Sequence, residues 1–168
     1  MRSKLIIAVL IALFTLPQIS TAQQSSVDTI ISELYSSISF NENKEPDYDK
    51  FQSLFIEGAR LISVRDTTSA TLTPADYESL MNKRRSSGTL LAFEEKELHR
   101  EMDKYGNILH VFSTYQTRVK TPDGEESARG INSIQLMKKD GHWKVTSLIW
   151  YEANEANPIP SQYLPAKN

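Results

Sequence analysis

The feature that most constrains the fold is the segment SIQLMKKDGHWKVTSLIWYE, residues 133–152, in which an Asp-Gly dipeptide separates two runs of alternating residues. Asp-Gly between such runs is among the strongest short-range signals for a β-hairpin. With Asp140-Gly141 as a two-residue turn, one face of the hairpin carries these pairs: Lys138 with Trp143, Leu136 with Val145, Ile134 with Ser147, Asn132 with Ile149 and Gly130 with Tyr151. The chain is therefore expected to contain an antiparallel sheet.

A second turn signal, the segment Thr121-Pro122-Asp123-Gly124, provides an independent check on which face is apolar. It joins a predicted strand over residues 107–119 to one over residues 127–137. The pairs that it places on one face are Leu109 with Leu136, Val111 with Ile134, Ser113 with Asn132 and Tyr115 with Gly130. Both turns select the same apolar face, and a slip of one residue would move every side chain to the other face. Gly130 leaves room there for the rings of Tyr115 and Tyr151.

The strand before these, residues 90–102, has two alternative registers because the Tyr105-Gly106 turn is a weaker signal. A tight loop places Met102, Arg100, Leu98 and Lys96 on the apolar face. A bulge places Glu101, His99, Glu97 and Glu95 there instead. The first register is favoured, because Met102 and Leu98 are apolar.

The first half of the chain has helical periodicity. In residues 27–40 apolar side chains recur every three and four positions, which predicts an amphipathic helix. A second helix is predicted over residues 48–55 and a strand over residues 59–64. A third helix is predicted over residues 74–83, because Thr73 is a favoured cap and proline is favoured at the first helical position. Helices followed by a meander of strands predict an α+β fold with the helices on one face of an antiparallel sheet.

The two ends of the chain predict export and a tail. A basic start precedes an unbroken apolar run, residues 5–14, and the small-x-small pattern Ser20-Thr21-Ala22 follows. These are features of a signal peptide, residues 1–22, because the run is too short to span a membrane. We therefore expect an exported protein, periplasmic or secreted, with residues 23–152 as a single domain. Residues 153–168 are expected to form an extended or disordered tail.

Composition argues against several kinds of site. The sequence has no cysteine, which excludes disulfides, thiolate zinc sites and a cysteine nucleophile. A net charge of −2 without a basic stripe argues against nucleic acid as a partner, and no membrane contact is expected after signal cleavage. His99, His110 and His142 lack the spacing of a metal site, so neither a metal nor a cofactor is predicted.

Both faces of the predicted sheet mix apolar and polar residues. Polar groups on a curved sheet beneath helices either line a cavity or satisfy one another. The candidates for lining a ligand pocket are Tyr35, Arg100, Ser113, Tyr115, Asn132, Ser147, Ile149 and Tyr151. A solvated face rarely carries a large aromatic cluster, so we expect a homodimer to cover the outer face, with the folded-back tail as the alternative. The candidates for this dimer face are Phe112, Ile131, Met137, Leu148 and Trp150.

The order of elements and the final hairpin resemble the nuclear transport factor 2-like superfamily, in particular its SnoaL-like bacterial members. The residues that carry the resemblance are Gly130, Ile134, Leu136, Asp140, Gly141, Trp143, Lys144 and Val145. The resemblance covers roughly residues 27–151. It implies a cone-shaped α+β fold with a strongly curved sheet wrapped over N-terminal helices, an internal pocket and frequent dimerisation through the outer sheet face.

This resemblance does not select one function, because the superfamily includes isomerases, dehydratases, cyclases and non-enzymatic binding proteins. Enzymes of this fold need an inward Asp, Glu or His with an assisting Tyr. The favoured register places Tyr115 and Tyr151 inside without such a group. The sequence therefore favours a non-catalytic module that binds a small, partly apolar ligand or a partner protein, with no catalytic residue. The alternative is an isomerase or lyase acting on a small carbonyl compound, which an ionisable residue facing Tyr115 would favour.

Overall fold

The computed structural model describes residues 21–166 of the chain. In chain order, the elements of this part are α1 (Thr21–Ile38), α2 (Tyr48–Ser53), β1 (Phe55–Val64), β2 (Ser69–Leu72), α3 (Pro74–Ser86), β3 (Ala92–Tyr105), β4 (Ile108–Thr121), β5 (Gly124–Lys139), β6 (His142–Glu152) and the 3₁₀ helix η1 (Ser161–Tyr163). All of the predicted signal peptide except Thr21 and Ala22 lies outside the described residues. Within this part of the chain, no helix is both long and apolar enough to cross a membrane.

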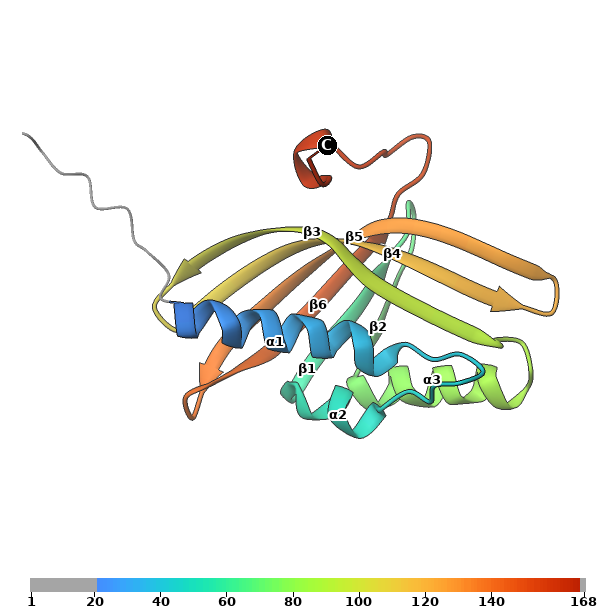
Figure 1. Cartoon of the computed structure of the whole chain (residues 1–168), viewed down its shortest axis with the longest axis horizontal. Helices are drawn as coiled ribbons and strands as arrows, with labels where there is room; N and C mark the ends of the chain where they lie inside the picture. Colours follow the sequence, from blue (N-terminus) through green and yellow to red (C-terminus); the bar gives the residue numbers. More distant parts are fainter. Residues whose placement is uncertain (1–20, 167–168) are drawn as a thin grey trace, which may run out of the picture.

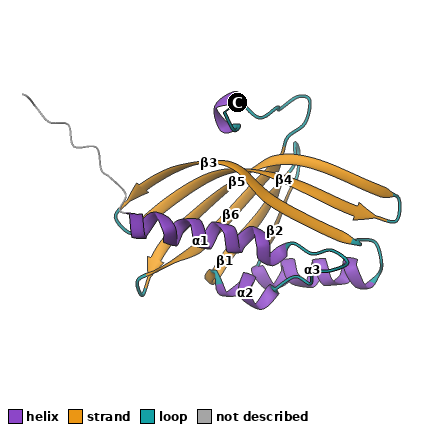
Figure 2. Cartoon of the chain, viewed as in Figure 1, coloured by secondary structure: helices purple, strands orange, loops and turns teal. Residues whose placement is uncertain are grey.

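The sheet is curved and mixed, and it carries the helices on one side. Its strand order is β2-β1-β6-β5-β4-β3. Strands β3 to β6 form the predicted antiparallel meander, whereas β1 runs parallel to β6, which corrects the prediction of a purely antiparallel sheet. Figures 1 and 2 show α1, α2 and α3 on one side of this sheet and the C-terminal segment on the other. The α+β architecture, a curved sheet wrapped over helices, is as predicted.

The start of α3 shows why local sequence predicted it well. The Thr73 hydroxyl accepts a hydrogen bond from the Asp76 N–H, and the Asp76 carboxylate accepts one from the Thr73 N–H. This reciprocal capping box satisfies two N–H groups that the helix leaves free, and Pro74 has none to satisfy. By contrast, α1 begins at Thr21, upstream of the predicted start at residue 27. The strand β2 lies in a segment too short and polar to show a period of two.

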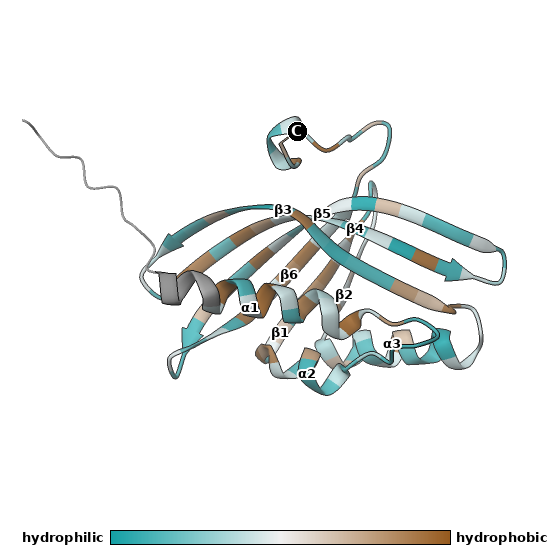
Figure 3. Ribbon diagram, viewed as in Figure 1, coloured by the Kyte–Doolittle hydropathy of each residue, from teal (hydrophilic) through white to brown (hydrophobic). Residues whose placement is uncertain are grey.

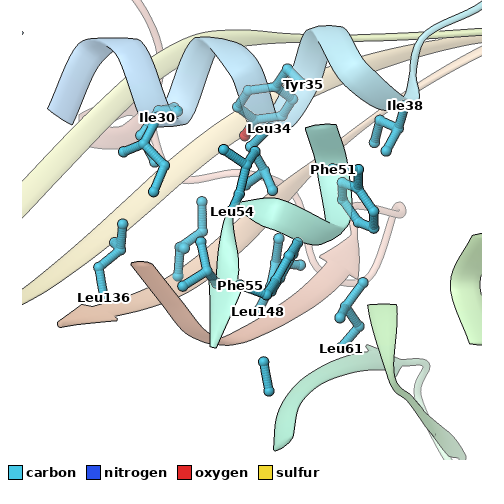
Figure 4. Packing of buried hydrophobic residues seen from close by; sticks show 14 of the residues in the cluster. Ile30, Leu34, Tyr35, Ile38, Phe51, Leu54, Phe55, Leu61, Leu136 and Leu148 are labelled. Atoms are coloured by element: carbon cyan, nitrogen blue, oxygen red, sulfur yellow. The ribbon is translucent and has the colours of Figure 1, made fainter. Parts of the chain in front are cut away.

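The core lies between α1, α2 and the middle of the sheet. In Figure 4, Ile30 and Leu34 of α1 point toward Leu136 and Phe55. We call one region of the inner sheet face its closed half, defined by Leu109, Val111, Ile134, Leu136, Trp143 and Val145, all of them buried. Figure 3 shows mainly apolar residues on the strands where they pass α1. Burying this apolar surface is the main source of stability in the fold.

The turn-based registers hold across β4 and β5. Every predicted pair between Leu109–Leu136 and Tyr115–Gly130 is present. Asp140 and Gly141 have φ values of 51° and 81°, as a two-residue hairpin turn with two left-handed positions requires. A Cβ on Gly130 would lie 2.4 Å from the Tyr115 hydroxyl oxygen and 2.4 Å from the Tyr151 carbonyl oxygen. Gly130 therefore makes room for the Tyr115 side chain as predicted, but for the backbone of Tyr151 and not its ring.

Strand β6 leaves its predicted register after Val145. Leu136 pairs with Val145 as predicted, but Gln135 pairs with Ser147, so Thr146 has no partner of its own in β5. This β-bulge adds one residue to β6 and reverses the facing of all residues that follow.

The reversal exchanges two predicted groups of residues. Leu148 and Trp150 now share the inner face with Ile134 and Asn132, so the prediction that they lie on the outer face is wrong. The prediction that Ser147, Ile149 and Tyr151 face inward is wrong for the same reason. Leu148 is 8 % exposed and Ile149 is 37 % exposed, in agreement with the pairing.

A second bulge in β3 combines the two alternative registers. The inner-face pairs are Met102 with Val111, Arg100 with Ser113, Glu97 with Tyr115 and Glu95 with Thr117. Leu98 is the extra residue. After it, Arg100 and Met102 face inward as in the favoured register, and before it, Glu95 and Glu97 face inward as in the alternative register. The prediction that Leu98 and Lys96 face inward is wrong. The bulge instead brings Glu95 to the inner face.

The segment after β6 folds back over the outer face of the sheet. The Thr114 hydroxyl donates a hydrogen bond of 2.6 Å to the carbonyl oxygen of Tyr163. The rings of Phe112 and Tyr163 meet edge to face, with centroids 4.9 Å apart. The tail thus covers Phe112, as the alternative to a dimer proposed. Ile131 and Met137 also lie on this face and are partly buried, and the homodimer stays a prediction.

Candidate functional site

A cavity of about 420 Å³ lies between α1, α3 and the inner face of the sheet. Its apolar walls include Leu34, Ile38, Leu61, Met81, Leu148 and Trp150. Its polar lining includes Tyr35, Tyr77, Glu95, Tyr115 and Asn132. Three further lining residues, Arg65, Arg84 and Glu152, are exposed to solvent and mark its open side. A volume of this size with a few polar groups among apolar walls is typical of a site for a small molecule.

Glu95 is the partly buried carboxylate of this cavity. Asn132 Nδ2 donates a hydrogen bond of 3.0 Å to its Oε1, and the Glu95 N–H donates one of 3.0 Å to the Ser39 hydroxyl. No donor among the described residues contacts Oε2. Burial raises the pKa of Glu95 from 4.5 to about 7, and the hydrogen bond from Asn132 lowers it in part. Near neutral pH this carboxyl group can therefore both accept and return a proton.

A hydrogen-bond chain with a defined direction supports Glu95. The Ser113 hydroxyl donates to Glu97 Oε1 at 2.6 Å. Ser113 has one proton to give, so in its contact of 2.7 Å with Tyr35 the Tyr35 hydroxyl is the donor. The Tyr35 oxygen accepts from Asn132 Nδ2 at 3.1 Å, and the second Asn132 proton goes to Glu95. Every donor in the chain is committed, which fixes the Asn132 amide against Glu95 Oε1.

Arg100 lies at the end of this series of hydrogen bonds and does not line the cavity. Its Nε donates to Glu97 Oε2 at 2.9 Å, and its Nη1 donates to Asp28 at 2.9 Å. The guanidinium forms an ion pair with Glu97, whose other carboxylate oxygen accepts the Ser113 proton. Arg100 lies instead along a groove of about 660 Å³ between α1 and β3. Its predicted role in binding a ligand inside the cone has no support in this geometry.

Two tyrosines offer free hydroxyl groups to the cavity. Burial, and then the charge of Glu95, raises the pKa of both Tyr77 and Tyr115, so both phenols stay protonated at neutral pH. Neither hydroxyl is hydrogen-bonded to any residue between positions 21 and 166. Tyr35 differs, because its hydroxyl donates to Ser113. Tyr77 and Tyr115 can therefore donate to an oxygen atom of a bound molecule.

The structure divides the sequence-predicted pocket residues into three groups. Tyr35, Tyr115 and Asn132 line the cavity, and Ser113 supports them through its hydrogen bond with Tyr35. Arg100 lies in the groove, and the remaining three, Ser147, Ile149 and Tyr151, lie on the outer face. Within the described residues, no group of three or more His, Asp or Glu side chains is arranged to hold a metal ion.

Sequence reasoning missed the lining roles of Glu95, Tyr77 and Trp150. Glu95 belonged to the register that was not favoured, since the signal for it lay in a bulge that alternation does not show. Tyr77 lies within the predicted third helix, residues 74–83, where nothing in the sequence marked it as a site residue. Trp150 was assigned to the outer face, and the bulge in β6 turns it inward.

No protein-family model and no curated protein matches the sequence, but solved structures match most of the chain. A scytalone dehydratase candidate from Novosphingobium aromaticivorans DSM 12444 has a TM-score of 0.61 and 12% identity over 79% of this chain and 85% of its own. Hexachlorocyclohexane dehydrochlorinase LinA-type3 from Novosphingobium barchaimii LL02 has a TM-score of 0.63 and 10% identity over 79% and 88%. An NTF-2 like protein of unknown function from Silicibacter pomeroyi DSS-3 has a TM-score of 0.56 and 8% identity over 80% and 100%. At such low identity these matches establish a shared fold and no more.

Proposed function

Because the chain has the nuclear transport factor 2-like fold and an ionisable carboxylate in its cavity, we propose that it is a proton-transfer enzyme. It would act as an isomerase or lyase on a small, partly apolar carbonyl compound. One observation carries the proposal: the Glu95 carboxylate lines the cavity with a free Oε2. Burial raises its pKa from 4.5 to about 7, which adds to this observation. The non-catalytic interpretation of the sequence rested on the lack of an inward acid or base, and Glu95 supplies one.

The groups around Glu95 suit removal of a proton from carbon next to a carbonyl. Glu95 Oε2 takes the proton, and the electron pair of the C–H bond moves into the C–C–O system to give an enolate. Tyr77 and Tyr115 donate hydrogen bonds to the enolate oxygen, where negative charge develops. Isomerisation follows if Glu95 returns the proton to a different carbon. Elimination follows if a leaving group departs from the β-carbon with its bonding electrons.

The pKa of Glu95 fits this role. A general base works best when its pKa lies near the operating pH, because it is then both sufficiently ionised and sufficiently basic. A glutamate at its ordinary value near 4.5 would be fully ionised but a weaker base. The rate of reaction is expected to rise with pH through about 7, because only the ionised carboxylate accepts the proton.

Two structural neighbours support the lyase branch by analogy alone. They are named as a dehydratase candidate and a dehydrochlorinase, terms for enzymes that eliminate water and hydrogen chloride. At their identities to this chain, this analogy reaches no residue and no substrate. The analogy supports only the point that a protein of this fold can catalyse an elimination reaction.

Exchange of carbon-bound hydrogen for deuterium tests the proposal without knowledge of the product. Small ketones such as 2-tetralone, incubated with the protein in D₂O, are followed by proton NMR. Wild type should accelerate loss of the α-proton signal, and Glu95→Gln should reduce the acceleration by about 100-fold or more. Glu101→Gln is the matched control, because Glu101 is an exposed carboxylate of the same strand that faces outward. Binding of the ketones without any exchange above buffer would favour a non-catalytic binding module.

Export is a separate part of the proposal, supported by the basic start and the apolar run of residues 5–14. Intact-mass measurement of the protein from its native source should give a chain that begins at Gln23. A chain that begins at Met1 in the cytoplasm would contradict export and leave the enzymatic proposal unaffected.

A further inference from the structure

We propose that the substrate carries an anionic group, such as a carboxylate, which Arg65 and Arg84 bind at the open side of the cavity. This inference rests on the proposed function and adds the substrate class, an aromatic or alicyclic keto acid. Arg65 directly follows β1, and Arg84 lies in the last turn of α3. Both side chains line the cavity from its exposed margin.

Neither of these two guanidinium groups forms an ion pair with any residue in the described part of the chain. Two other arginines in the fold differ. Arg85 pairs with Glu45 and lies over the Phe40 ring, and Arg100 is held by Glu97 and Asp28. Arg60, Arg118 and Arg129 are likewise without an ion pair in the described part of the chain, but among the unpaired arginines Arg65 and Arg84 are the two that line the cavity. A guanidinium matches the two oxygens of a carboxylate through parallel hydrogen bonds.

The charge of Arg84 also reaches the interior. It lowers the pKa of the Tyr77 phenol, against the larger raising effects of burial and of Glu95. Tyr77 is one of the two phenols that face the reacting oxygen in the proposed mechanism. A cation in this position favours a negative ligand and the negative charge that develops on the enolate.

Glu152 is the opposing charge at the same margin. It follows Tyr151, the β6 residue paired with Val64, so in register it is the carboxylate next to Arg65. No ion pair joins Glu152 and Arg65, and the charge of Glu152 raises the pKa of Tyr115 on the other side. Glu152 therefore disfavours an anion along β6 and directs it toward β1 and α3. Its removal should strengthen anion binding.

The body of the ligand is set by the walls between the margin and Glu95. Leu72, Leu80, Val119 and Trp150 are among the apolar residues that line the cavity. A cavity of about 420 Å³ holds a molecule of one or two rings with space for a carboxylate at its opening. A keto acid of this size can place its carboxylate on the arginines and an acidic C–H near Glu95.

Calorimetric binding of two unreactive probes tests this inference. The probes are 2-naphthoate and 2-naphthamide, which share a ring system and differ in charge. Wild type should bind 2-naphthoate about tenfold more tightly than 2-naphthamide or better. Arg65→Gln and Arg84→Gln should each remove part of this preference, and the double variant should remove it entirely while binding of 2-naphthamide stays unchanged. Arg118→Gln, which changes an exposed arginine that does not line the cavity, is the control.

Equal affinities for the two probes in wild type, no binding of 2-naphthoate, or a preference that survives the double variant would each overturn the inference. Glu95→Gln separates it from the proposed function, because this variant should lose deuterium exchange and still prefer 2-naphthoate. An anion preference without any exchange in wild type would sink only the enzymatic proposal. Exchange of neutral ketones that depends on Glu95, without an anion preference, would sink only the anion site.

Discussion

The two halves of the inner sheet face use the same strands for opposite purposes. In the closed half, Val111, Ile134 and Val145 are 0 % exposed and pack as an apolar core under α1. In the other half, which we call the cavity half, Glu95, Tyr115 and Asn132 line the space of about 420 Å³. Close packing favours stability, whereas a carboxylate in an apolar cavity costs stability and can perform chemistry. The comparison shows how one sheet can separate these demands along its strands.

A β-bulge occurs on each side of the boundary between the halves. In β3 the extra residue is Leu98, and in β6 it is Thr146. Each bulge reverses which side chains face inward. As a result Glu95 enters the cavity from β3, and Leu148 and Trp150 enter it from β6. Bulges bend strands and redirect side chains, and both effects are needed where a packed core gives way to a site.

The largest expected effect is in the closed half. Ile134→Ala should lower the free energy of unfolding by about 3 kcal/mol, because the Ile134 side chain is fully packed and its truncation leaves a cavity. Urea denaturation measures it, with Ile108→Ala as the control at a position that is 61 % exposed. The control should change stability by less than about 0.5 kcal/mol. Equal costs at both positions would break the comparison between packed and open regions.

The next effect is a pH dependence in the cavity half. Folded protein keeps the Glu95 proton up to a pKa of about 7, while unfolded chain loses it near 4.5. Unfolding therefore releases a proton in this window, so the contribution of Glu95 to stability falls as pH rises from about 4.5 to about 7. The total loss is on the order of 3 kcal/mol, and Glu95→Gln should lack it. Denaturation midpoints measured across pH that run parallel in wild type and variant would rule out a raised pKa.

A smaller effect is expected at the boundary. Ser113→Ala leaves the Tyr35 hydroxyl without an acceptor and removes a donor from Glu97, so it should cost about 1–2 kcal/mol. Ser133→Ala is the control on the outer face, where the hydroxyl contacts the partly buried His110. Its cost should be smaller, because water can replace that contact. If the two variants unfold at the same denaturant concentration, the buried chain is not a connected unit.

The smallest effect concerns the outer face. Tyr163→Ala should lower stability by about 1 kcal/mol through loss of its ring contact with Phe112.

The part of this face left open by the tail is the proposed dimer contact. The dimer is tested separately by light scattering. Wild type should be a dimer and Ile131→Glu a monomer, since Ile131 lies on the outer face that would form the contact. A wild-type monomer would leave the tail as the sole cover that the chain provides.

Local signals in the sequence predicted much of this fold. The Asp140-Gly141 turn and the capping box at Thr73 act within a few residues, so their geometry follows from residue type. The geometry of the two bulges does not follow from residue type in this way. Alternation continues on both sides of the extra residue, so the sequence gives no sign that the side chains change the face on which they lie. The parallel pairing of β1 with β6 joins segments far apart in the sequence, and no turn specifies it. The candidate site depends on the bulges and on the long-range strand pairing. For this reason the inward position of Glu95 became clear only from the structure.

The most direct test of the account is the titration of the Glu95 side chain itself. Carbon-13 NMR of the side-chain carboxyl, assigned by its absence in Glu95→Gln, follows protonation at this one atom. We expect a midpoint near pH 7, because burial in the cavity disfavours the charged form. A midpoint near the ordinary value of 4.5 would contradict it, since Glu95 would then be a solvated carboxylate without the basicity that proton transfer at carbon requires.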